Sequence, residues 1–152
     1  MTTTQFDFAN EEWELIASAP VIVGYAVARA EDSGFMGSLR ETRTLVASIA
    51  AGAEDNPARS LIDGATTTEV RELMKEYGSS APEYLADTAV EVCTRLVPVL
   101  GDTATTEESV GYRRWVLEVA RSVAEAAREH RVRVSEPEAD LLARVADALD
   151  LS

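Results

Sequence analysis

The chain has 152 residues, of which 46% are hydrophobic, and its 27 acidic and 14 basic residues give a formal net charge of −13. This length fits a single domain over residues 1–152, with enough apolar residues to bury a core. The acidic surface argues against nucleic-acid and membrane partners, because phosphate groups repel it. Cations, a basic protein partner or a second copy of the chain in a homodimer remain as candidate partners.

The N-terminal residues 1–5 have no basic or long apolar run, and no stretch approaches the ~20 apolar residues of a membrane span. A cytoplasmic location is therefore expected. Lys75 is the only lysine, and an acidic chain poor in lysine suggests a halophilic source or a GC-rich genome. Cys93 is the only cysteine, so it forms no internal disulfide and is expected to be a small buried hydrophobe.

Helix signals recur along the chain and predict an all-α fold, a compact bundle of seven or eight helices. Asn10 is predicted to cap a first helix. Pro20 is predicted to stop or kink it, because proline lacks the N–H that a helix interior needs. Ser18 is then predicted to cap a second helix over residues 21–30. Further on, Asn56 and Pro57 are predicted to open a short helix that ends at Gly64.

Capping boxes, in which Ser or Thr is followed three residues later by Glu, predict where further helices begin. The five pairs are Ser38 and Glu41, Thr66 and Glu69, Ser80 and Glu83, Thr105 and Glu108, and Ser135 and Glu138. The first and last pairs lie 97 residues apart, and each follows a helix and a polar turn. This spacing suggests two degenerate helical repeats, with chance recurrence of a common cap as the alternative.

The turn after the second predicted helix contains the one candidate site. Glu31 and Asp32 lie in a glycine-bearing turn, and Glu41 follows at the start of the next helix. Oxygen-rich, flexible loops suit hard cations such as calcium or magnesium. The alternative is that Glu31 and Asp32 are a solvated pair of loop residues and that Glu41 serves only its capping box.

This turn resembles the TerB-like tellurite-resistance family, whose all-helical domains carry a motif of the form Ala-Asp-Gly-x-Ile-x-x-x-Glu. The matching residues are Ala30, Asp32, Gly34, Met36, Ser38 and Glu41. The resemblance implies a stress-response module whose acidic surface binds a divalent cation such as calcium, magnesium, manganese or zinc. Because the corresponding second turn, residues 129–134, is basic, the metal ligands are assigned to Glu31, Asp32 and Glu41, assisted by Glu125 or Glu138.

Catalytic patterns are missing from the sequence. His130 is the only histidine, so the chain cannot supply the two Glu-x-x-His motifs of a di-iron bundle. It has no nucleophile elbow and no glycine-rich phosphate loop, and we therefore expect no enzyme. Trp13 and Trp115 are predicted core anchors, with an apolar ligand pocket between helices as the alternative. The alternative function is a metal-free helical protein-interaction domain or homodimer.

Overall fold

The computed structural model describes residues 2–30, 34–128 and 136–151, with the side chains of 34–41, 127 and 128 excepted. Over these residues the chain forms seven α-helices and one short 3-10 helix, which confirms the predicted all-α bundle. The elements are η1 (Gln5–Asp7), α1 (Asn10–Arg29), α2 (Gly34–Ala51), α3 (Arg59–Ala65), α4 (Val70–Glu76), α5 (Pro82–Thr103), α6 (Thr106–Arg128) and α7 (Glu136–Ala148).

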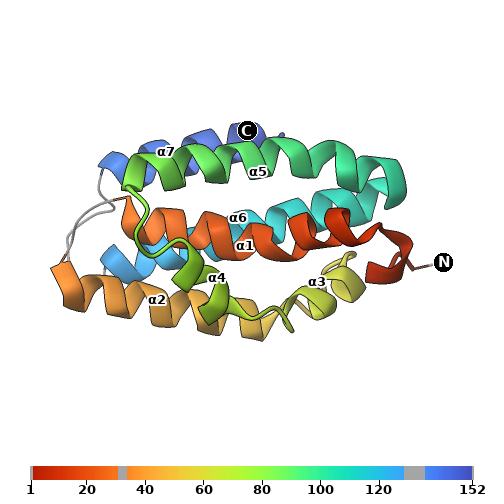
Figure 1. Cartoon of the computed structure of the whole chain (residues 1–152). Helices are drawn as coiled ribbons and strands as arrows, with labels where there is room; N and C mark the ends of the chain where they lie inside the picture. Colours follow the sequence, from red (N-terminus) through yellow and green to blue (C-terminus); the bar gives the residue numbers. More distant parts are fainter. Residues whose placement is uncertain (1, 31–33, 129–135, 152) are drawn as a thin grey trace.

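Helix α1 lies at the centre of the bundle and packs against α5, α6, α2 and α4. Figure 1 shows α5 and α7 on one side of α1 and α6, and α2 with the short helices α3 and α4 on the other. Nearly every side chain of α1 from Leu15 to Ala28 is buried. A helix that is apolar all round is stable only where neighbours cover it on all sides, which explains its central place.

The predicted break at Pro20 is wrong, because α1 continues through it from Asn10 to Arg29. In an α-helix the N–H of each residue donates to the carbonyl four residues earlier, so Pro20 leaves the carbonyl of Ile16 without that donor. The hydroxyl of Tyr112 on α6 donates a 2.5 Å hydrogen bond to this carbonyl. Ile16 and Tyr112 are both fully buried. A neighbouring helix thus supplies the donor that proline lacks, and Ser18 is a mid-helix residue instead of a cap.

The capping box of Thr105 and Glu108 is confirmed. The amide of Thr105 donates to Glu108 Oε1 at 2.9 Å, and the amide of Glu108 donates to Thr105 Oγ1 at 3.1 Å. Thr3 adds two further donors, its amide to Oε2 at 2.9 Å and its hydroxyl to Oε1 at 2.6 Å. Burial alone would raise the pKa of the Glu108 carboxyl, but these hydrogen bonds outweigh burial and lower the pKa below its ordinary value.

Two other predicted caps are wrong. The hydroxyl of Thr66 donates to the carbonyl of Asp63 at 2.7 Å, which ends α3, and α4 begins only at Val70. Helix α5 begins at Pro82 with no side-chain cap from Ser80, because proline itself favours the first turn of a helix.

At the start of α1, Ala9 and not Asn10 precedes the first turn, and the Glu12 side chain accepts the Ala9 amide at 2.9 Å. The pair of Ser135 and Glu138 falls partly outside the described residues, since only Glu138 is placed, in the first turn of α7. His130 also lies outside the described residues.

The core prediction holds for Trp115 and Cys93. Trp115 is 2% exposed and meets Tyr112 edge to face, with ring centroids 5.4 Å apart. Cys93 is fully buried, which raises the pKa of its thiol to about 12.

Helix α2 approaches α1 closely at Gly24, where a Cβ atom would overlap the buried side chain of Leu45. None of the described helices combines the length and apolar character needed to cross a bilayer.

Candidate binding groove

The structure places only part of the predicted cation site. Glu31, Asp32 and the side chain of Glu41 lie outside the described residues. Glu125 is exposed on α6, whereas Glu138 is 1% exposed on α7. Among the side chains that the structure does describe, no three His, Cys, Asp or Glu residues are grouped to hold a metal ion. The cation site therefore stays a prediction.

The start of α2 corrects the predicted capping box of Ser38 and Glu41. The helix begins at Gly34, so Ser38 lies inside it and Glu41 lies seven residues after its first residue. At 1.5 Å per residue, Glu41 is about 10 Å along the helix axis from that start. The earlier start places Gly37 inside α2. A glycine in a helix interior costs only about 1 kcal/mol relative to alanine, and packing of α2 against α1 and α6 offsets this cost.

A groove of about 760 Å³ runs between α1, α4 and α5. Three helices line it, and we refer to it as the α1–α4–α5 groove. Its floor is apolar and includes two half-buried aromatic side chains, Trp13 and Tyr77. The floor residues are Trp13, Leu15, Ile22, Leu73, Tyr77 and Val92. Leu15, Ile22 and Val92 are buried. The apolar side chains of the groove that a partner can reach are therefore the half-buried Trp13, Leu73 and Tyr77.

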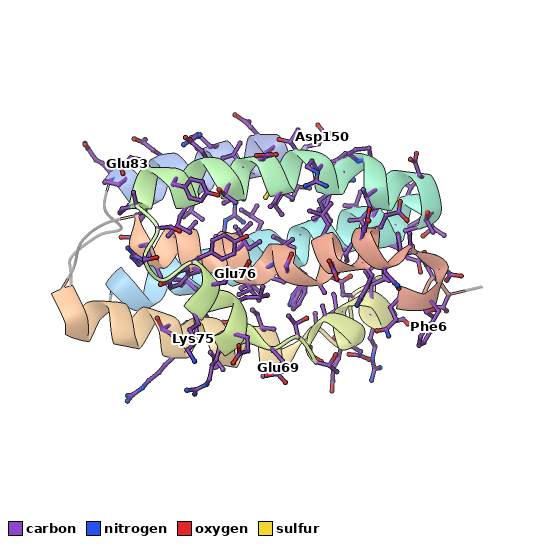
Figure 2. All side chains as sticks on the ribbon, viewed as in Figure 1. Phe6, Glu69, Lys75, Glu76, Glu83 and Asp150 are labelled. Carbon is purple, nitrogen blue, oxygen red and sulfur yellow. The ribbon has the colours of Figure 1, made fainter. Side chains whose placement is uncertain are left out.

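The rim of the groove is negatively charged. Glu11 and Glu14 on α1 lie on one side, and Glu69 and Glu72 at the start of α4 lie on the other. All four are exposed, and Figure 2 labels Glu69 where the chain enters α4. Arg95 of α5 adds a basic side chain to the lining. Carboxylates therefore outnumber basic groups around the apolar floor.

Local interactions hold α4 beside α1. Val70 is buried at the first position of α4, and Arg29 at the last position of α1 reaches the loop that follows α4. The guanidinium of Arg29 donates to the carbonyl of Gly78 at 3.2 Å and to that of Ser80 at 3.0 Å. It also donates to the hydroxyl of Tyr25 at 3.1 Å. Burial of Val70 anchors the first turn of α4 and the Arg29 bonds anchor the loop after its last turn, so the groove wall does not depend on the helix propensity of seven residues alone.

The two aromatic residues of the floor are held in different ways. Trp13 lies against α3, where a Cβ atom on Gly64 would come about 3.0 Å from its ring, so a larger residue there would have to push the indole by a few tenths of an ångström. Tyr77 follows the end of α4. Burial first, and then the nearby Glu76 and Tyr84, raise the pKa of its phenol above the ordinary value.

A second hollow of about 560 Å³ lies between the 53–57 loop and the start of α6. Asn56 crosses it, donating to the carbonyl of Gly111 at 2.9 Å while its own oxygen accepts the amide of Ala58 at 2.8 Å. None of the described side chains that line this hollow is aromatic. It is therefore a weaker candidate for binding than the α1–α4–α5 groove.

The residues of the groove were not predicted together from the sequence. Trp13 was predicted as a core anchor, with an apolar pocket between helices as the alternative. It packs against the core, is half-buried and lines the groove floor. A usable signal was present in two segments, 11–15 and 69–73, in which glutamates stand next to large apolar residues. Only the packing of α4 on α1 reveals that these two segments face the same space.

Comparison with protein-family models, with curated proteins and with solved structures finds no match to this chain. The TerB-like resemblance and the stress-response role that it implies therefore stay predictions.

Proposed function

We propose that this chain is a non-catalytic protein-interaction module and that the α1–α4–α5 groove is its docking surface. The observation that carries the proposal is the apolar floor of the groove, with Trp13 and Tyr77 partly accessible between three helices. Aromatic side chains in a desolvated centre, surrounded by a polar rim, are typical of residues that dominate protein interfaces.

A docking role fits the groove better than catalysis does. The carboxylates of the groove are exposed at its rim, whereas acid–base catalysis by a carboxylate pair depends on a shared environment that excludes water. The floor supplies area for an apolar partner surface, and helices that lie in such grooves use apolar residues at i, i+3, i+4 and i+7.

The two tryptophans provide a direct assay. Trp115 is 2% exposed in the core, whereas Trp13 lines the groove, so a change in tryptophan emission on adding a ligand reports on Trp13. The probe is a synthetic amphipathic peptide of about three helical turns, with leucine and alanine on one face and glutamine on the other. We expect saturable binding with a blue shift of the emission, and Trp13→Phe removes the signal.

A blocking variant tests the location. Ser18 lines the groove and its hydroxyl donates only within its own helix, to the carbonyl of Leu15 at 3.3 Å, so Ser18→Phe fills the groove at small local cost. Ser122 on α6 makes the same kind of bond, to the carbonyl of Glu118 at 3.0 Å, and lies outside the groove. Ser18→Phe should abolish binding and Ser122→Phe should preserve it. No saturable binding by the wild-type chain, or equal binding by both variants, would refute the proposal.

A further inference from the structure

We infer that the natural occupant of the α1–α4–α5 groove is a basic amphipathic helix of a partner protein. This inference rests on the proposed function and adds the chemistry of the partner. The apolar floor and the acidic rim together require a segment with two unlike faces, one apolar and one rich in Lys or Arg.

The length of the groove agrees with a docked helix. The α1 residues that line it run from Glu11 to Ile22, which lie eleven positions and about 16 Å apart along the helix. Leu15 and Ile22 are seven positions apart and lie on the same face of α1. A helix of about three turns therefore covers the floor from end to end.

The rim decides the charge of the occupant. Glu11 and Glu14 on one wall and Glu69 and Glu72 on the other lie where the flanks of a docked helix would be. Opposite charges across an interface accelerate encounter and exclude wrong partners more than they add affinity. An acidic segment would meet like charges on both walls and is therefore disfavoured.

Charge also argues against the other candidate occupants of the groove. A second copy of the chain would bring its own net charge of −13 to an acidic rim, which disfavours a homodimer through this face. Nucleic acids and anionic lipid headgroups carry the same unfavourable sign. A basic partner segment is the occupant that satisfies both the floor and the rim.

The experiment compares three peptides that share one apolar face and differ in the polar face, which is lysine, glutamine or glutamate. Trp13 emission follows binding to the full chain at low and high salt. We expect the lysine peptide to bind at least about tenfold more tightly than the glutamate peptide, with the ratio falling as salt rises. If the glutamine peptide binds but the three affinities are equal, this inference fails while the proposed function stands; if none binds, both fail.

Charge-reversal variants show whether the rim, and not the overall charge, sets the preference. The double variant Glu14→Lys with Glu72→Lys reverses one charge on each wall of the groove, and both side chains are exposed. Asp102→Lys with Asp140→Lys makes the same change in net charge at exposed positions outside the groove. The rim variant should lose the preference for lysine and the control should keep it. A preference that survives in the rim variant, or falls equally in both, would overturn the inference.

Discussion

The hydrogen bond between Tyr112 and Ile16 allows a sharp test of how this fold accommodates a buried proline. Pro20 provides no amide for the Ile16 carbonyl, and the buried Tyr112 hydroxyl donates to that carbonyl instead. Burial raises the pKa of this phenol above its ordinary value, so the hydroxyl is a protonated donor at neutral pH. Tyr112→Phe removes this donor and leaves the aromatic ring in place.

The expected cost of Tyr112→Phe follows from burial. Leaving a buried carbonyl without a hydrogen-bond donor lowers the free energy of unfolding by about 1–3 kcal/mol. Pro20→Ala restores an amide that the Ile16 carbonyl can accept. Tyr112→Phe should therefore cost less in the Pro20→Ala background than in the wild type, with a coupling energy of about 1 kcal/mol.

Urea unfolding followed by far-UV circular dichroism measures all four members of this cycle. Pro98 in α5 is a matched control, because it is also inside a helix but is exposed, as is Thr94 four residues earlier, so water reaches the carbonyl there. Pro98→Ala should show no coupling with Tyr112→Phe. An equal cost of Tyr112→Phe in the wild-type and Pro20→Ala backgrounds would refute the reasoning.

Three further predictions concern the cap at Glu108, the helix contact at Gly24 and the predicted cation site. Glu108→Gln should lower the free energy of unfolding by about 1–3 kcal/mol at neutral pH, because Thr3 then loses a charged acceptor. The folded-state pKa of this carboxyl is lowered, so its stabilisation is present above the unfolded value of about 4.5 and is lost as pH falls through the folded value. Urea titrations should show variant and wild type converging in acid, and a constant difference would contradict this. Gly24→Ala should cost about 1–3 kcal/mol by overlap with Leu45, whereas Gly101→Ala, with open space around it, should be neutral or stabilising; equal effects in thermal melts would contradict the packing argument. If the acidic turn binds calcium, magnesium, manganese or zinc, the melting temperature should rise with the concentration of that ion, and no shift with any of them would remove the cation hypothesis.

Local sequence signals predicted the helices better than their ends. The capping box at Thr105 correctly places the start of α6, because both partners of the box lie within three residues of each other. Helix α1 was divided in two by Pro20, because the donor that rescues it comes from Tyr112, 92 positions further along the chain. The hydroxyl of Thr66 can bond either at the end of α3 or at the start of the next helix. The residues around Thr66 do not decide between these two roles, and in the structure the hydroxyl bonds at the end of α3.

The candidate site was the harder inference. Glu31, Asp32 and Glu41 were brought together on the assumption that a helix begins at Ser38, but α2 begins at Gly34. The α1–α4–α5 groove joins residues that lie about 60 positions apart, such as Trp13 and Leu73, and no periodicity within either segment predicts that pairing.

The amino-acid sequence by itself determined the class of the fold, the acidic character of the surface and the burial of residues such as Cys93 and Trp115, because these depend on composition and helical periodicity. Only the tertiary structure decided that α1 runs unbroken through the core and that α4 lies beside it. Both outcomes depend on contacts between distant segments, the Tyr112 hydroxyl in one case and Arg29 in the other. The same long-range packing leaves an apolar floor between acidic walls, and the proposed function rests on that surface.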